Sequence, residues 1–175
     1  MTAGTELSPA AKAGTITLGG DLTVNRMGYG AMRITGQGIW GPPNDVDAAL
    51  AWLKREFDLP IIFAGFSFGA ATGLRAACPH PDVKALISIG TPVEADGRLY
   101  SYSFLRDCAK PKLFVSGDHD QYGPHAALEA VVAQAAPPKK LVFVPGDHFF
   151  QGHLNELRAA VETWLRQLLA GRTVC

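Results

Sequence analysis

Four short apolar runs recur in the later part of the chain, and each is followed by a loop or by a segment with helical periodicity. Val, Ile, Leu and Phe fill these runs almost without polar alternation, as strands buried on both faces of a parallel sheet require. Strands that alternate with helices predict an α/β layered fold with right-handed crossovers. The predicted strands are residues 61–64, 83–89, 112–115 and 140–144, and the predicted helices between and after them are residues 69–77, 124–135 and 155–169.

Helical periodicity is clearest at the two ends of this region. A helix is predicted over residues 44–57, because Asn44 suits a helix N-cap and apolar residues follow on one face. The last helix carries a longer apolar stripe, which predicts one buried face. The members of this stripe are Leu154, Leu157, Val161, Leu165 and Leu168.

The first 43 residues have a different pattern. Residues 15–18 and 22–24 are short β-prone runs, and the Gly-Gly-Asp sequence between them suits a tight hairpin turn. Residues 1–13 show no periodicity and predict a flexible tail. Three segments are therefore expected: a tail at 1–13, a hairpin and connector at 14–43, and an α/β domain at 44–175.

The charge balance narrows the class of partner. Sixteen Lys and Arg residues are matched by 16 Asp and Glu residues, so the formal net charge is zero. Proteins that bind nucleic acid or anionic membranes need an excess of Lys and Arg, which this chain lacks. The expected partner is a small molecule, with no nucleic acid, no membrane and no cofactor.

The cysteines bear on the cellular compartment. Cys78, Cys108 and Cys175 form no CxxC pair, and their odd number leaves one unpaired. This pattern fits buried thiols in a reducing compartment better than a disulfide framework. The first 14 residues contain no apolar leader, so a cytoplasmic protein is expected.

The sequence Gly-Phe-Ser-Phe-Gly at residues 65–69 lies between a predicted strand and a predicted helix. A GxSxG motif in this position is typical of a nucleophile elbow, a sharp turn that holds a strained serine at the carboxyl end of a strand. The two glycines are expected to keep side chains away from that turn. Ser67 is therefore the candidate nucleophile, and the backbone N–H of Phe68 is the candidate donor to an oxyanion.

A serine nucleophile needs a base and an acid, and two of the later predicted strands end in suitable residues. Asp118 and Asp120 follow the strand at 112–115, and His148 follows the strand at 140–144. His148 is the candidate base. Asp120 is favoured over Asp118 as the orienting acid, because the acid must reach past the strand end toward the imidazole.

Through the motifs GFSFG, SGDHDQYGP and PGDHFFQGH, residues 44–169 resemble the C-terminal part of a small α/β-hydrolase. The resemblance implies a truncated α/β-hydrolase core with a mostly parallel sheet, preceded by a β-hairpin segment. It also implies a carboxylesterase-type serine hydrolase that cleaves small esters through an acyl-enzyme on Ser67. Family members usually place several strands and a loop with a second oxyanion donor before the nucleophile. The alternative is therefore a catalytically weak pseudo-enzyme or an acyl-binding remnant of a hydrolase.

Residues 14–43 resemble instead the N-terminus of an aldo/keto reductase, through TITLGGDLTVNRMGYGAMRITGQGIWGPP. The catalytic Asp, Tyr, Lys and His of that family come later in its barrel and have no counterpart in this sequence. The resemblance therefore implies a fusion or chimera and carries no reductase chemistry.

Aromatic residues are candidates for a substrate pocket. Phe66, Tyr100, Tyr102 and Phe104 could line an acyl pocket, and packing alone explains the last three equally well. A metal site is the less favoured interpretation of the nearby polar residues, because the hydrolase pattern already explains Asp120 and His148, and no metal is expected. The side chains that such a site would use are Asp118, His119, Asp120, His148 and His153.

The strand at 61–64 is expected to expose one edge, because the strands that flank it in complete hydrolases have no counterpart before it. An apolar strand edge needs cover. A homodimer is therefore expected, with the N-terminal hairpin as a further cover for the same edge.

Overall fold

The computed structural model describes residues 15–18, 22–25, 46–57 and 59–171. The chain divides into two compact units, Met1–Leu59 and Pro60–Cys175, and each is described by itself. Among the described residues, none of the helices is both long enough and apolar enough to cross a membrane. The domain boundary predicted near residue 44 stays a prediction.

The first unit contains the predicted hairpin strands and the predicted helix. Strands β1 (Thr15–Leu18) and β2 (Leu22–Asn25) pair antiparallel, with Thr15 opposite Asn25. Helix α2 spans Val46–Phe57 and ends with Lys54 and Arg55 in its last turn, where cations are favourable near the carbonyl end of a helix. The hairpin turn and the Asn44 cap lie outside the described residues.

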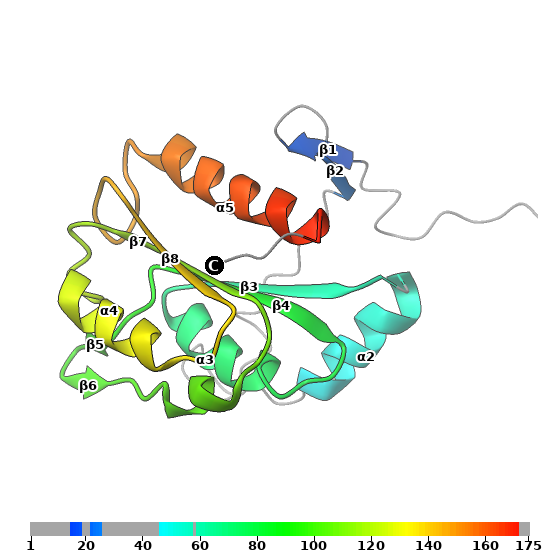
Figure 1. Cartoon of the computed structure of the whole chain (residues 1–175), viewed down its shortest axis with the longest axis horizontal. Helices are drawn as coiled ribbons and strands as arrows, with labels where there is room; N and C mark the ends of the chain where they lie inside the picture. The colour runs from blue at the N-terminus through cyan, green and yellow to red at the C-terminus, as the bar shows by residue number, and fades with distance from the viewer. Residues whose placement is uncertain (1–14, 19–21, 26–45, 58, 172–175) are drawn as a thin grey trace, which may run out of the picture. The chain divides into compact units, whose positions relative to one another are not determined.

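The second unit is built on a four-stranded sheet in the order β3-β4-β7-β8 (Figure 1). All three strand pairs are parallel, which confirms the predicted sheet and the α/β fold class. Each strand begins or ends within two residues of its predicted limits. The strands are β3 (Ile61–Phe66), β4 (Val83–Ile89), β7 (Lys112–Gly117) and β8 (Lys139–Val144).

Helices cover both faces of this sheet (Figure 1). Helix α3 (Phe68–Ala77) and helix α4 (His125–Gln134) lie on one face, and helix α5 (Leu154–Leu169) lies on the other. The core under α5 is apolar because alternate residues of β4 and β7 point to that face. Its buried members are Ala85, Ile87, Leu113, Val115, Val144, Phe150 and Trp164.

The predicted stripe of α5 is largely confirmed. Leu157, Val161, Leu165 and Leu168 pack against this core. Leu154 is the exception, because it is 63% exposed. It is the first residue of the helix, where the chain has only just left the preceding loop. The stripe therefore begins one turn later than its periodicity predicts.

A long connection joins β4 to β7. It contains a short antiparallel pair, β5 (Glu94–Ala95) and β6 (Arg98–Leu99), and a 3-10 helix, η2 (Ser103–Asp107). The chain then returns to the amino end of the sheet and enters β7 at Lys112.

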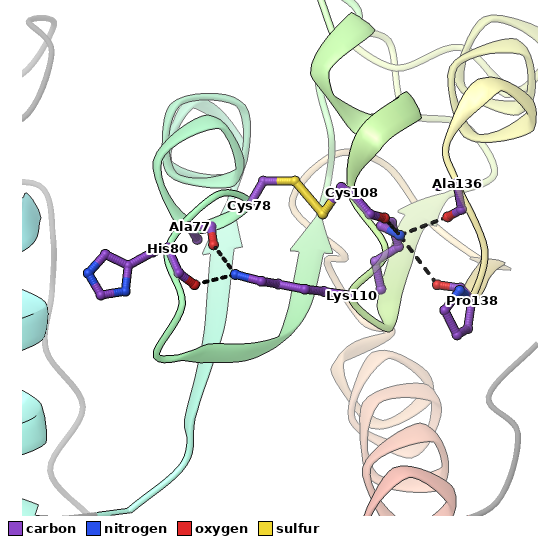
Figure 2. Close-up of a disulfide and its surroundings, with 8 residues drawn as sticks. Ala77, Cys78, His80, Cys108, Lys110, Ala136 and Pro138 are labelled. Atoms are coloured by element: carbon purple, nitrogen blue, oxygen red, sulfur yellow. Dashed lines mark hydrogen bonds between the residues drawn. A yellow bond between two sulfur atoms is a disulfide. The ribbon is translucent and has the colours of Figure 1, made fainter.

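Cys78 and Cys108 form a disulfide, so the expectation of free thiols is wrong for this pair (Figure 2). Their Cα atoms lie 5.9 Å apart although 30 residues separate them in sequence. Cys78 ends α3 and Cys108 ends η2, and each stands a few residues before one of the neighbouring parallel strands β4 and β7. Strand pairing therefore brings the two cysteines together. The count of cysteines no longer supports the expected reducing compartment.

Two lysines lie beside the disulfide. The Nζ of Lys110 donates to the carbonyl groups of Ala77, at 3.0 Å, and His80 (Figure 2). The Nζ of Lys112 is buried and donates to the carbonyl oxygens of Cys108 at 2.6 Å and Ala136 at 2.8 Å. The carbonyl groups that accept from these two ammonium groups lie at the ends of helices and in loops, and those of Ala77 and His80 also accept backbone N–H groups.

Candidate active site

Ser67 lies at the turn between β3 and α3. Its backbone has φ 52° and ψ −124°, which is a strained conformation for a residue with a Cβ atom. The N–H of Ser67 donates to the carbonyl of Ile89 at 2.9 Å, so the β3–β4 ladder continues up to this residue. The turn is thus held from β4, and it places Ser67 at the carboxyl end of the sheet and at the N-terminus of α3.

The two glycines of the motif have different surroundings. A Cβ atom at Gly65 would lie 2.7 Å from the carbonyl oxygen of Gly69 and 2.8 Å from Cα of Ala70, so β3 and α3 approach too closely for a side chain there. A Cβ atom at Gly69 would meet nothing within 4 Å. The expectation that both glycines keep side chains away from the turn is therefore correct for Gly65 and wrong for Gly69.

His148 follows β8 and is 2% exposed. Its Nε2 lies 2.8 Å from Oγ of Ser67, and its Nδ1 lies 2.9 Å from Oδ2 of Asp120. Gly90, directly after β4, passes close beneath the ring: a Cβ atom there would lie 3.2 Å from Cε1 of His148. Gly90 also has φ +55°, so both its conformation and its lack of a side chain suit this position.

Asp120 is buried and receives hydrogen bonds at both carboxylate oxygens. Oδ1 accepts from the backbone N–H groups of Tyr122 at 2.9 Å and Gly123 at 3.2 Å. Oδ2 accepts from the hydroxyl of Ser116 at 3.1 Å in addition to His148. Burial alone would raise the pKa of Asp120, but the hydrogen bonds and the charge of His148 outweigh it and hold the pKa below its usual value. Asp120 is therefore favoured as an anion.

Asp118, the other candidate acid, points elsewhere. Its Oδ1 lies 2.6 Å from Nδ1 of the exposed His119 and accepts the N–H of Gly146 at 3.0 Å. Desolvation opposes ionisation, yet the hydrogen bonds from Gly146 and His119 and the charge of His119 together outweigh it and lower the pKa of Asp118. The structure thus brings Asp120, and not Asp118, to the imidazole of His148.

Phe68 is the first residue of α3 and directly follows Ser67. Its backbone N–H therefore belongs to the first turn of the helix, where the partial charge of the helix end is positive. An oxyanion donor is expected at this position of a nucleophile elbow.

Three aromatic rings surround the imidazole. The ring centroid of His148 lies 5.1 Å from Phe66, 4.7 Å from Tyr122 and 5.2 Å from Phe149. Tyr122 and Phe149 meet the imidazole edge-on, with interplanar angles of 74° and 86°. The imidazole is therefore held by rings as well as by its two hydrogen bonds.

The other three predicted pocket residues contact a different part of the molecule. The hydroxyl of Tyr102 donates to the carbonyl of Pro92 at 2.6 Å, and burial, with the nearby Tyr100, raises the pKa of Tyr102. Phe104 packs against Tyr102 at 6.2 Å and lies under the guanidinium of Arg75. Tyr100 lies under Arg98. None of the interactions described for these rings reaches Ser67 or His148, so their pocket role stays a prediction.

The five residues of the less favoured metal site are distributed over separate interactions. Asp120 binds His148, Asp118 binds His119, and His153 lies 3.4 Å from Glu156. No group of three or more His, Cys, Asp or Glu side chains is arranged to hold a metal ion within the described ranges.

Sequence reasoning missed Gly90, Ser116, Tyr122 and Phe149. A signal exists for Ser116, because it is a polar residue that follows three apolar residues in a buried strand and must bond within the protein. Gly90 could be suspected as a glycine directly after a buried strand. The two rings had no comparable signal, because their role depends on where two loops meet.

Comparisons with known proteins give partial matches to an oxidoreductase and to α/β hydrolases. No protein-family model matches it. An uncharacterised oxidoreductase from Schizosaccharomyces pombe is 52% identical over 62 residues, which are 35% of this chain and 20% of that protein. The match falls at the N-terminus, where the reductase-like segment is predicted.

Solved structures of α/β hydrolases match a larger share of the chain. An α/β serine hydrolase homologue from Coxiella burnetii is 34% identical, with a TM-score of 0.59 over 73% of this chain and 64% of that one. A protein of unknown function from Agrobacterium tumefaciens, described as a putative α/β hydrolase, is 26% identical, with a TM-score of 0.66 over 86% of this chain and 67% of that one. The chain spans a fifth of the oxidoreductase and less than two thirds of the Coxiella burnetii protein. Its parallel sheet and flanking helices have the fold of the α/β hydrolases.

Proposed function

We propose that this chain is a serine hydrolase of carboxylesterase type that cleaves small ester substrates. Ser67 is the nucleophile, His148 the base and Asp120 the orienting acid. The observation that carries the proposal is the continuous hydrogen-bonded chain from Oγ of Ser67 through both ring nitrogens of His148 to Oδ2 of Asp120. The strained backbone of Ser67 and the α/β hydrolase structures of similar sequence support it.

The geometry suits a two-step acyl transfer. His148 takes the hydroxyl proton of Ser67 at Nε2 while Oγ attacks the ester carbonyl, and the N–H of Phe68 donates to the oxyanion. The Nδ1–H of His148 stays on the Asp120 carboxylate, which stabilises the imidazolium. The proton then passes to the departing alcohol, and water hydrolyses the acyl-enzyme by the same route in reverse order.

Labelling with a fluorophosphonate probe tests the nucleophile directly. The folded chain is expected to react at Ser67, and the label is expected to disappear in Ser67→Ala. The same protein is expected to hydrolyse p-nitrophenyl acetate and butyrate. His125→Ala is a matched control for His148→Ala, because His125 is an exposed histidine whose ring stacks on Phe143.

The second candidate is a catalytically weak pseudo-enzyme or acyl-binding remnant. It is favoured by the share of the Coxiella burnetii hydrolase, more than a third, that this chain does not match. A chain that is folded by circular dichroism but takes no label and turns over no ester would support this remnant and contradict the esterase.

We also propose that the chain forms a homodimer. In the described part of the chain β3 pairs with β4 alone, so its other edge offers backbone groups to a second strand. Light scattering is expected to give about twice the monomer mass of 18.6 kDa. A clean monomer at micromolar concentration would contradict the dimer. A soluble protein after deletion of residues 1–43 would show that the hairpin does not protect the sheet.

The N-terminal segment at 14–43 is proposed to derive from an aldo/keto reductase without its chemistry. The partial match to an oxidoreductase supports this origin. Titration with NADPH, followed by fluorescence, is expected to show no binding. Saturable binding at micromolar concentration would contradict the proposal.

A further inference from the structure

Two exposed phenylalanines lie beside the hydrogen bond between Ser67 and His148. Phe66 precedes Ser67 and is 43% exposed, and Phe149 follows His148 and is 55% exposed. Their ring centroids lie 6.4 Å apart, and each lies close to 5 Å from the imidazole. Two large apolar side chains therefore form one small surface at the candidate nucleophile and base. We call these two residues the phenylalanine pair.

The fold leaves this pair beyond the end of the core. Residues two apart in a strand face the same side of the sheet, so Phe66 shares a side with Ile62. Ile62 packs against the core under α5, whereas Phe66 is the last residue of β3. The two rings thus keep apolar area in water, although single exposed apolar residues are common. Their contact with each other and with His148 distinguishes them from such residues.

We propose that the phenylalanine pair binds an apolar alcohol group, the leaving group of the ester. This inference rests on the proposed esterase function. The ester oxygen of the leaving group must reach Nε2 of His148 to receive its proton, whereas the acyl carbon becomes bonded to Oγ of Ser67. Both rings flank the imidazole, so a group carried by the ester oxygen extends over them. Tyr122 also lies edge-on to the imidazole, but it is not a member of the phenylalanine pair.

The chemistry of the rings defines the ligand class. Neither Phe66 nor Phe149 offers a donor or acceptor in its side chain, so the surface rewards apolar contact area alone. An unbranched alkyl or an aryl alcohol fits this requirement, and a charged or sugar alcohol does not. A fully buried methylene changes an equilibrium constant about fourfold. A surface open on one side buries about half of each methylene, so each added methylene is expected to raise kcat/KM about twofold.

Two ester series separate the alcohol from the acyl group. In the first, ethyl, butyl and hexyl acetate share one acyl group, and kcat/KM from pH-stat titration is expected to rise about 16-fold from ethyl to hexyl. In the second, ethyl acetate, butyrate and hexanoate share one alcohol. Phe149→Ala is expected to reduce the ratio of kcat/KM between hexyl and ethyl acetate to about 4-fold or less. It is expected to leave the ratio of kcat/KM between ethyl hexanoate and ethyl acetate unchanged.

Two further variants control for indirect effects. Phe149→Leu keeps an apolar side chain and is expected to restore most of the alcohol-length dependence. Leu169→Ala removes an equally exposed apolar side chain, 62% exposed, from the far end of α5 and is expected to change neither ratio. Phe149 is exposed, so its truncation is expected to leave the fold intact. An unchanged alcohol ratio in Phe149→Ala would overturn the proposal, and so would a fall confined to the acyl series.

A binding measurement separates this inference from the esterase proposal. Titration of the Ser67→Ala variant with 1-hexanol and with ethanol, followed by NMR, requires no turnover. Changes in the chemical shifts of Phe66 and Phe149 with 1-hexanol but not with ethanol would support alcohol binding at the phenylalanine pair, even if no ester were hydrolysed. The absence of such changes would overturn this proposal, even if esters were hydrolysed. Conversion of a dimer to a monomer by Phe149→Ala would show that a second copy covers the pair and would also overturn the proposal.

Discussion

The two ends of the same four-stranded sheet hold their polar groups in different ways. At the carboxyl end, side chains bond to each other: the half-buried Ser67 to the buried His148, and His148 to the buried Asp120. At the amino end, Lys112 bonds to backbone carbonyl groups, and a disulfide joins Cys78 to Cys108 (Figure 2). In the proposed function the polar groups at the carboxyl end transfer protons, whereas those at the amino end fix the chain.

The difference follows from what each end must do. Ser67 is held at positive φ, which costs stability, and its hydroxyl bonds to the imidazole of His148. The amino end carries a cross-link of the type that restricts the unfolded chain. Burial, followed by repulsion from Lys139, lowers the pKa of Lys112 to about 8. A buried cation is costly, so its carbonyl partners are needed to keep it in place. Stability and reactivity are thus distributed to opposite ends of the strands.

The largest expected effect lies at the carboxyl end. Ser67→Ala or His148→Ala is expected to lower kcat by about 10⁴ to 10⁶-fold, and the double variant is expected to be little worse than either, because the residues act as one unit. In Ser67→Ala the unfolding free energy is expected to change little. His148→Ala also removes a buried side chain and a hydrogen-bond partner of Asp120, so it is expected to destabilise the fold as well. Additive losses of activity would contradict a cooperating pair, and a large loss of stability in Ser67→Ala would break the comparison between the two ends.

Removal of the disulfide is expected to have the opposite signature. Cys78→Ala/Cys108→Ala opens a loop with a sequence separation of 30 residues. The loop-closure relation gives a loss of about 3 to 4 kcal/mol in the free energy of unfolding, measured in urea. The change in kcat/KM is expected to stay below about twofold, since the site lies at the other end of the strands. Cys175→Ala serves as the control. Loss of activity at unchanged stability would contradict this division.

The two glycines of the motif sharpen the comparison within the carboxyl end. Gly65→Ala forces a side chain between β3 and α3 and is expected to cost about 1 to 3 kcal/mol of unfolding free energy, with loss of activity. Gly69→Ala meets no atom and is expected to cost nothing, because alanine also favours the helix α3 in which residue 69 lies. Equal destabilisation by both changes, measured by thermal and urea unfolding, would show that the close approach is not the reason for Gly65.

The smallest expected effect is a pH dependence of stability. The lowered pKa of Asp120 means that its ionised form stabilises the folded state. This contribution is present above the unfolded carboxyl pKa of about 3.9 and is lost as the pH falls through the lower folded value. The stability difference between the wild type and Asp120→Asn is therefore expected to be constant from about pH 5 to 7 and to shrink below about pH 4. A stability difference between the two proteins that grows as the pH falls would contradict a lowered pKa of Asp120.

Periodicity and local motifs predict most of the second unit. Apolar runs without alternation identify the four strands, since burial on both faces leaves few other choices. The position of the motif between β3 and α3 identifies Ser67. The order of strand ends brings Asp120 and His148 into consideration, but only the turn after β7 decides between Asp120 and Asp118.

The remaining features depend on contacts between distant segments. The Cys78–Cys108 pair exists because β4 and β7 are neighbours, and no local pattern encodes that pairing. The place of Gly90 beneath His148 likewise requires the sheet order to be known. Leu154 fits the helical stripe by spacing, yet the loop before it leaves the residue in water. Spacing along the chain thus predicts elements better than it predicts their partners.

The hydrogen bond between Ser67 and His148 joins residues 81 positions apart, and that between His148 and Asp120 joins residues 28 apart. Strands β4 and β7 lie between β3 and β8, so the bond between Ser67 and His148 needs the whole sheet. The bond between His148 and Asp120 lies within the single crossover unit β7-α4-β8. A contact as distant as that between Ser67 and His148 forms only after the chain between the two residues has been ordered, and it slows folding. During refolding from urea, ester hydrolysis is therefore expected to return after the helical circular dichroism signal, as a reporter of the completed topology.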